Sequence, residues 1–283
     1  MMQVQWYPGH MTKARRMMQE DIKLVDLVIE LIDARIPLSS RNPDIDELAR
    51  GKSRLILLNK SDLADAAMNK KWQEYFAKNN ITTLVIDSKA RAGFGPINSA
   101  IEKVCADKIE RDRKKGIIGR PVRAMVVGIP NVGKSTFINS LCKKASTKTG
   151  NKPGVTKGKQ WIKLSKGVDL LDTPGILWPR FENEQTGLNL AFIGSINDEI
   201  LDETELAINL IDRIKSSYPG ALYNRYGCDE SLVTTVILEE TAVKRGCLKK
   251  GNEPDIGKAA HIILDDFRSG KLGHITLEDP DKV

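Results

Sequence analysis

The 283-residue sequence lacks the features that mark several classes of protein. No apolar run approaches the roughly 18 residues that a membrane span requires, so we expect no membrane partner. The first residues, MMQVQWYPGHM, have no basic segment followed by an apolar core, which argues against a secretory signal. The cysteines are scattered and form no C-x-x-C pair: Cys105, Cys142, Cys228 and Cys247. This pattern favours buried, reduced thiols over a disulfide or zinc framework, and we expect a cytoplasmic protein.

What the sequence does contain is the composition of a globular protein with a sizeable core, at 41% hydrophobic and 29% charged residues. The net charge is +7, and the cations are clustered. Between Lys143 and Val168 there are eight lysines and no acid, and further basic stretches cover 13–16 and 108–123. Such clusters can be a solvated face, but beside a phosphate-binding loop they favour a polyanionic partner such as nucleic acid.

The pattern of apolar residues predicts an α/β domain followed by a helical one. Met11, Ala14, Met18, Ile22 and Val25 share one stripe of a helix. Short apolar runs then alternate with helical patterns, as in a doubly wound sheet, at 26–34, 54–60, 82–88 and 123–128. A strand pair near a sheet edge is expected at 160–165 and 168–172. After about residue 182 the pattern is helical, at 203–215, 230–246 and 255–270. We therefore expect domains at 1–181 and 182–283.

The segment GIPNVGKS, residues 128–135, matches the phosphate-loop (P-loop) pattern and lies between a strand and a helix. Its glycines let backbone N–H groups surround phosphate oxygens. Lys134 can neutralise the β- and γ-phosphates as the main catalytic charge, and Ser135 can ligate Mg²⁺. The phosphate-binding candidates are Asn131, Val132, Gly133, Lys134, Ser135 and Thr136.

A second motif, NKSD at 59–62, follows an apolar strand. The Asp62 carboxylate can accept two hydrogen bonds from the guanine edge, a donor pair that adenine lacks. Asn59 would tie neighbouring loops together, and the Lys60 stem would lie on the base. The alternative is an ordinary turn in which Asp62 caps a helix. Together with the P-loop, the motif favours guanine. The strand-end segment DSKA, with Asp87 and Ser88, would support the base through its backbone.

A third segment, DTPG at 172–175, ends an apolar strand some 40 residues after the P-loop. Asp172 can hold a water of Mg²⁺, and the Gly175 N–H can contact the γ-phosphate. Thr156, which ends PGVT, is a candidate second hydroxyl ligand of Mg²⁺, with a plain Pro-Gly turn as the alternative. Ile176 follows Gly175 where hydrolysing switches often carry an amide that holds the attacking water.

The order of these motifs differs from the usual GTPase order, because NKSD and DSKA precede the P-loop. Such an order is a circular permutation, which is feasible where the termini of a domain lie close together. The chain that leaves DTPG then runs into the helical domain. A shift at Gly175 that depends on the γ-phosphate would therefore pull on that domain.

These segments together resemble the ribosome biogenesis GTPase A family over essentially the whole chain. The resemblance rests on WYPGHMTKARR, NKSD, GIPNVGKST, PGVTKGKQW, DTPGILWPRFE and DFRSGKLG. It implies a circularly permuted GTPase that binds GTP and GDP and acts in late assembly of the large ribosomal subunit. It further implies contacts with the rRNA and proteins of the subunit precursor, with the helical domain as the RNA-facing module.

The resemblance also suggests how water is handled without a catalytic Gln. In this family, a histidine of the N-terminal P-G-H-M stretch is the proposed substitute, which here is His10. A helix-capping or surface histidine is the alternative. In several GTPases an Asn at the place of Asn131 helps to hold K⁺ against the phosphates, so potassium stimulation is implied here. A loop-shaping hydrogen bond is the alternative for Asn131.

Three functions follow from these patterns. The first is a GTPase switch whose hydrolysis on the large subunit triggers release, acting as a monomer. The second is a nucleotide-gated rRNA placeholder whose hydrolysis is incidental. The third, an ATP-using enzyme on the same loop, is opposed by NKSD.

Overall fold

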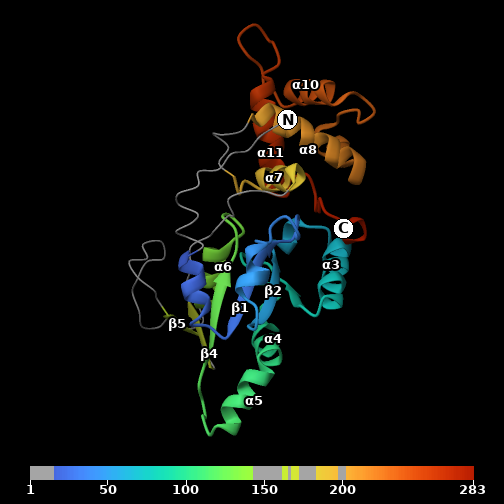
Figure 1. Ribbon diagram of the computed structural model, residues 1–283. Helices are drawn as coiled ribbons and strands as arrows, with labels where there is room; N and C mark the ends of the chain where they lie inside the picture. Colours follow the sequence, from blue (N-terminus) through green and yellow to red (C-terminus); the bar gives the residue numbers. More distant parts are fainter. Residues whose placement is uncertain (1–15, 143–160, 165–166, 172–182, 197–201) are drawn as a thin grey trace.

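A computed structural model describes residues 16–142, 161–164, 167–171, 183–196 and 202–283. A six-stranded sheet in the order β3-β2-β1-β4-β6-β5 forms its centre (Figure 1). Its strands are β1 (Leu27–Asp33), β2 (Ser53–Asn59), β3 (Thr82–Val85), β4 (Val122–Val127), β5 (Trp161–Leu164) and β6 (Val168–Leu171). Neighbouring strands are parallel except for β5 and β6, which form the expected edge pair in antiparallel register.

Helices cover both faces of this sheet. Residues 16–22 are helical, in agreement with the described part of the predicted N-terminal stripe. The helices associated with the sheet are α2 (Asp44–Leu48), α3 (Ala66–Lys78), α4 (Ile97–Val104), α5 (Ala106–Lys114) and α6 (Lys134–Cys142). The side chain of Asp65 caps α3 by accepting hydrogen bonds from Ala67 N and Met68 N. The cap of this helix is therefore Asp65 and not Asp62.

The central strand β1, LVIELID, is buried on both faces, as its mainly apolar sequence predicts, and its internal charge, Glu30, forms buried ion pairs with Arg41 and Arg54. Leu27, Ile29 and Leu31 point to one core cluster, which also holds residues of α4 and α6. Val28 and Ile32 point to the opposite face, where they join separate clusters under the N-terminal helix, α2 and α3. Because side chains alternate along a strand, the apolar residues of this one strand supply both layers.

The C-terminal half is helical, as predicted. It contains α7 (Glu184–Phe192), α8 (Glu203–Ser217), α9 (Ala221–Tyr226), α10 (Thr234–Lys244) and α11 (Ile256–Arg268). Helix α10 begins four residues later than the pattern at Glu230 suggests, because Ser231 N donates to Asp229 Oδ1 and Val233 is extended. No described helix is both long and apolar enough to cross a membrane. The four cysteines are free thiols.

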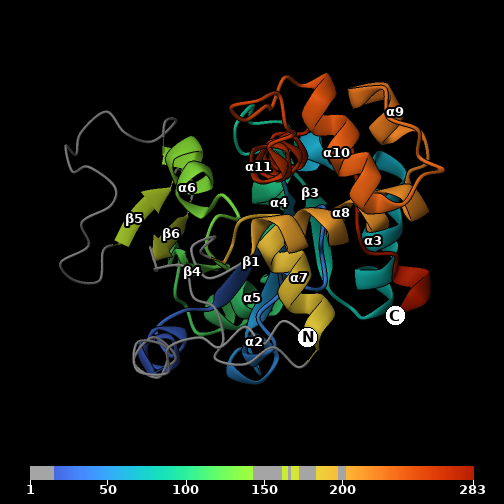
Figure 2. The same cartoon turned by 90° about the horizontal axis from the view of Figure 1, so that it is seen from above.

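The helical half lies beyond one end of the sheet, with α7 nearest to it (Figure 1). Seen from that end, α6 and β5 lie on one side of the molecule and α8, α10 and α3 on the other (Figure 2). The main core cluster is continuous from the sheet into α7, α8, α10 and α11. The two halves therefore share one core instead of meeting at a thin, separate interface.

Residues 271–283, the C-terminal strap, return from the helical half to the first domain. Ile275 N donates to Leu63 O over 3.1 Å, and Leu277 N donates to Arg35 O over 2.8 Å. The half-buried Glu278 carboxylate accepts hydrogen bonds from Leu38 N, the backbone and hydroxyl of Ser39, and Asn189 Nδ2. The last residues of the chain thus pack against the domain that contains NKSD.

Candidate nucleotide-binding site

The P-loop residues 128–135 connect the carboxyl end of β4 to the first turn of α6. Asn131 and Gly133 have left-handed φ values of 61° and 96°. A Cβ on Gly133 would lie 2.5 Å from Asn59 Nδ2, so only glycine fits there. Lys134, the first residue of α6, is buried, whereas Ser135 and Thr136 are exposed. A glycine turn entering a helix N-terminus presents backbone N–H groups to phosphate oxygens.

Asn59 joins the three loops that the sequence singles out. Its Nδ2 donates to Val132 O in the P-loop over 2.8 Å, and its Oδ1 accepts from Ser88 N over 3.0 Å. Ser140 of α6 closes the arrangement by donating from Oγ to Ser88 O over 2.8 Å. The structure therefore brings together segments that lie about 70 residues apart, in the tying role expected of Asn59.

The remainder of NKSD forms a tight turn on the surface. Lys60 has a left-handed φ of 58°, and Ser61–Leu63 form a 3₁₀ turn in which Asp62 is exposed. Ser61 N donates to Ile86 O over 3.2 Å, which ties this turn to the end of β3. The exposed Asp62 carboxylate, on a turn that the backbone holds in place, can therefore accept hydrogen bonds from the edge of a base.

The DSKA segment lies next to this turn. Asp87 Oδ1 accepts hydrogen bonds from the backbone N–H groups of Lys89 and Ala90, which shapes the loop. The buried Ser88 Oγ has no hydrogen-bond partner among the described residues. A buried, unpaired hydroxyl of this kind can take its missing partner from a bound ligand or an ordered water.

Two charged residues that the sequence analysis missed lie behind the turn. Asp33, at the end of β1, is paired in register with Asn59, and its Oδ2 lies 3.1 Å from Lys60 Nζ. Arg35 makes a bidentate pair with the same carboxylate, at 2.9 and 2.8 Å. Burial alone would raise the pKa of Asp33, but Arg35 and Lys60 outweigh it and hold that pKa well below its usual range. Asp33 is therefore ionised.

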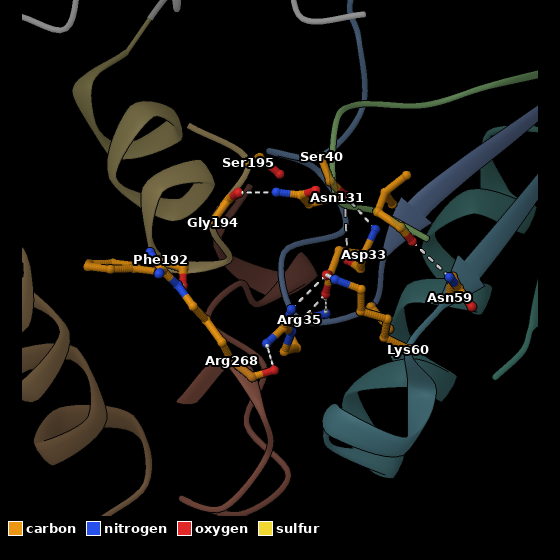
Figure 3. A network of polar contacts seen from close by, with 12 residues as sticks. Asp33, Arg35, Ser40, Asn59, Lys60, Asn131, Phe192, Gly194, Ser195 and Arg268 are labelled. Atoms are coloured by element: carbon orange, nitrogen blue, oxygen red, sulfur yellow. Dashed lines mark hydrogen bonds and ion pairs between the residues drawn. The ribbon is translucent and has the colours of Figure 1, made fainter. Parts of the chain in front are cut away.

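The P-loop also contacts the helical half directly (Figure 3). Asn131 Nδ2 donates to Gly194 O over 2.5 Å, and Ser195 Oγ donates to Pro130 O over 2.8 Å. Gly194 and Ser195 follow the end of α7. The amide nitrogen of Asn131 therefore ties the P-loop to the end of α7, while both alternatives for its role stay predictions.

Several predicted site residues lie outside the described residues: His10, Thr156, Asp172, Gly175 and Ile176. The residues that are described fit a magnesium-bound phosphate group in one respect. Ser135 presents its hydroxyl on the exposed side of the first turn of α6, next to Lys134. A hydroxyl beside phosphate oxygens suits the hard Mg²⁺ ion.

A P-loop joined through an asparagine to an N-K-x-D turn, with that turn earlier in the chain, defines a circularly permuted P-loop GTPase. A family model described as "50S ribosome-binding GTPase" matches residues 123–236. The chain is 45% identical to ribosome biogenesis GTPase A of Bacillus licheniformis, over all of both chains. It is 34% identical to the Thermotoga maritima protein of that name, over 98% of this chain and 95% of that protein.

A solved structure agrees with these relatives. The GNP-bound YlqF of T. maritima superposes with a TM-score of 0.67 at 30% identity, covering 95% of this chain and 99% of that one. The chain belongs to the ribosome biogenesis GTPase A family. It is a GTPase that hydrolyses GTP and takes part in ribosome biogenesis, and the family implies the usual dependence on Mg²⁺.

Proposed function

We propose that this GTPase is a switch in late maturation of the large ribosomal subunit. Its GTP form docks on the subunit precursor, the subunit stimulates hydrolysis, and hydrolysis releases the protein. The observation that carries this proposal is the direct contact between the P-loop and the helical half, through Asn131 and Ser195. A change at the phosphates then reaches a surface that can hold or release a partner.

The residues of the site have separate roles in this proposal. Lys134 neutralises charge that develops on the phosphates, and Asp62 recognises guanine, with Asn59 and Lys60 shaping its turn. Ser135, Thr156 and, through a water, Asp172 would hold Mg²⁺, which supplies charge stabilisation to the phosphates. The Gly175 N–H would contact the γ-phosphate and so make the site sensitive to its presence.

The attacking water needs another partner, because Ile176 has no group that can hold it. We assign this role to His10, whose imidazole can orient or deprotonate water near neutral pH. The amide oxygen of Asn131 is the atom that could ligate K⁺, whose positive charge would act on the phosphates. Both groups would act once the ribosomal partner orders the site, so the protein alone should turn over slowly.

The bacterial relatives at 44–46% identity support a location in the bacterial cytoplasm, and we propose that the protein acts there as a monomer. The competing function is a nucleotide-gated rRNA placeholder whose hydrolysis is incidental. The clustered cations support contact with rRNA under either function.

Release from subunits tests the switch. Large-subunit precursors are loaded with the GTP-bound protein, and the bound fraction is followed by sedimentation after chase. We expect release with GTP, retention with a non-hydrolysable analogue, and retention of His10→Ala with GTP. If His10→Ala leaves the subunit as fast as wild type while its GTP affinity is unchanged, His10 has no part in release. If wild type leaves equally fast with GTP and the analogue, the placeholder is correct.

A further inference from the structure

The NKSD turn is connected to the helical half by a row of buried charges (Figure 3). The row begins at Lys60, whose Nζ lies 3.1 Å from Asp33 Oδ2. The Asp33 side chain is completely buried, and the Lys60 side chain is 23% exposed. The ammonium is thus held from inside the protein, while the stem of Lys60 remains part of the surface turn. Asp33 therefore fixes one end of the side chain that was expected to lie on the base.

Arg35 connects Asp33 to helix α11. Besides its two bonds to Asp33, its Nη1 donates to Phe267 O and Arg268 O, each over 3.3 Å. These carbonyls end α11, where a helix has unsatisfied acceptors and favours a cation. The guanidinium also lies 5.2 Å from the centre of the Phe267 ring. One fully buried side chain therefore links the carboxylate behind NKSD to the last turn of α11.

Arg268 extends these contacts toward the P-loop. Its guanidinium donates to Phe192 O over 3.1 Å and to Ala191 O over 2.9 Å, at the end of α7. The turn that follows contains Gly194, whose carbonyl accepts the hydrogen bond from Asn131. The base turn is thus tied to the end of α11 and the P-loop to the turn after α7, and Arg268 joins these two helix ends.

A buried ion pair contributes little to folding relative to a well-packed apolar pair, because desolvation offsets the attraction. Such a pair can instead specify position. Here the Asp33–Arg35 pair lies between Lys60 and the carbonyls that end α11, so directed polar contacts join the NKSD turn to that helix end.

We propose that Asp33 and Arg35 are positioning residues for guanine-nucleotide binding, through which the end of α11 sets the place of Lys60 and the NKSD turn. The proposal rests on the assignment of NKSD to the guanine base in the proposed function. It extends that function by making the helical half part of the nucleotide site. A partner that moves α11 would thereby alter nucleotide affinity, and nucleotide would alter the partner's affinity by the same factor.

A double-mutant cycle tests whether Asp33 acts through Lys60. The dissociation constant for GDP is measured for wild type, Asp33→Asn, Lys60→Met and the double variant, each in the full chain. In a chain that keeps Lys60, we expect Asp33→Asn to weaken GDP binding about tenfold. In a chain that already carries Lys60→Met, we expect the same change to weaken it less than about twofold. Equal effects of Asp33→Asn in both backgrounds would overturn the proposal, because Asp33 would then act on the fold as a whole.

A second pair of variants remains informative if Asp33→Asn fails to fold. Arg35→Lys keeps a cation beside Asp33 but loses the bidentate geometry and its reach to α11. Its matched control is Arg225→Lys, since Arg225 pairs with the buried Asp266 at 2.8 Å within the helical half. We expect both variants to lower the unfolding midpoint, and only Arg35→Lys to weaken GDP binding, by about fivefold to tenfold. Equal GDP affinity of the two variants would overturn the proposal.

Repeating the binding measurement with ADP, and with the variant Asp62→Asn, separates this proposal from the assignment of NKSD to the guanine base. Wild type should bind GDP far more tightly than ADP, and Asp62→Asn should remove that preference. If wild type shows no preference, the assignment of NKSD fails. If the preference holds while the Asp33 and Arg35 variants bind GDP as wild type does, only the positioning proposal fails.

Discussion

The two halves of this GTPase carry opposite charge. Residues 1–181 contain 33 Lys and Arg against 18 Asp and Glu, whereas residues 182–283 contain 11 against 19. The basic balance of the whole chain therefore comes from the domain that binds nucleotide. Net electrostatic attraction to RNA phosphates would therefore come from that domain, and the helical half, expected from the family resemblance to face RNA, would have to contact it through local basic faces.

One basic surface of the first domain is well separated from the helical half. Helix α5 and the turn after it lie at the far end of the molecule (Figure 1). Arg113, Lys114, Lys115 and Arg120 are exposed there, and Ile118 at the tip of the turn is 93% exposed. Lys114 and Arg120 have distant acidic partners there, Glu110 and Asp112, each at 3.8 Å, whereas in the helical half Arg225 pairs with the buried Asp266 at 2.8 Å and Arg245 pairs with it at 3.4 Å.

The largest contrast between the halves should appear in catalysis. Lys134→Met removes the cation of the P-loop and should lower GTP hydrolysis by about 100-fold or more. Lys258→Met removes an exposed cation from α11 and should leave hydrolysis within about twofold of wild type. Single-turnover hydrolysis measures both. A similar loss of GTP hydrolysis in both variants would show that the catalytic effect of removing a cation does not distinguish the P-loop from α11.

Base specificity should also belong to the first domain alone. Asp62→Asn replaces a double acceptor by a group that also donates, which suits xanthine better than guanine. We expect GTP binding to weaken at least about tenfold and xanthosine triphosphate binding to strengthen. Competition binding with the two nucleotides measures the change. An unaltered preference for GTP would remove Asp62 from base recognition.

RNA affinity should follow the charge difference. Changing Arg113, Lys114 and Lys115 to Gln should weaken binding to large-subunit RNA about tenfold and reduce the slope of log affinity against log salt by roughly three. The matched control changes Lys249, Lys250 and Lys258 of the helical half to Gln and should weaken binding less. If the control has the larger effect, the helical half supplies the main RNA contact despite its negative charge.

The smallest expected effect is at the C-terminal strap, where the halves meet. Burial raises the pKa of Glu278 above its usual value of 4.5, although several donors surround the carboxylate. The folded chain then keeps a proton that the unfolded chain releases, so stability should fall as the pH rises above about 4.5.

Glu278→Gln should remove this pH dependence of the free energy of unfolding, which amounts to at most about 1.4 kcal/mol per pH unit. Urea unfolding of both chains between pH 4.5 and 7 measures it. A constant difference in unfolding free energy between the two chains across this range would show that Glu278 does not titrate there.

The sequence predicts the local parts of this molecule well. The six strands, the edge pair and the P-loop context are confirmed, because apolar periodicity and glycine turns act over a few residues. The tying position of Asn59 also follows from motif knowledge. Arg35 escaped notice because the carbonyls that it contacts in α11 lie more than 230 residues away, and Asp33 because its partners are Arg35 itself and Lys60 of the next strand end. Their one local signal was a carboxylate ending a buried strand beside the strand of NKSD.

The C-terminal strap was missed for the same reason. Residues 271–283 have no helical or strand periodicity, and their place is set by hydrogen bonds to Leu63, Arg35 and Leu38. The boundary at 181–182 remains a prediction, and the shared core shows how closely the two halves are joined. The roles of His10, Thr156, Asp172 and Gly175 also remain predictions.

The most direct test of the switch is GTP hydrolysis by the purified protein with and without large ribosomal subunits, in potassium and in sodium buffer. We predict a slow basal rate that subunits raise strongly, with a further dependence on potassium if Asn131 helps to hold that ion. A rate that is indifferent to subunits in both salts would contradict this prediction, because the catalytic arrangement would then not be completed on the ribosome.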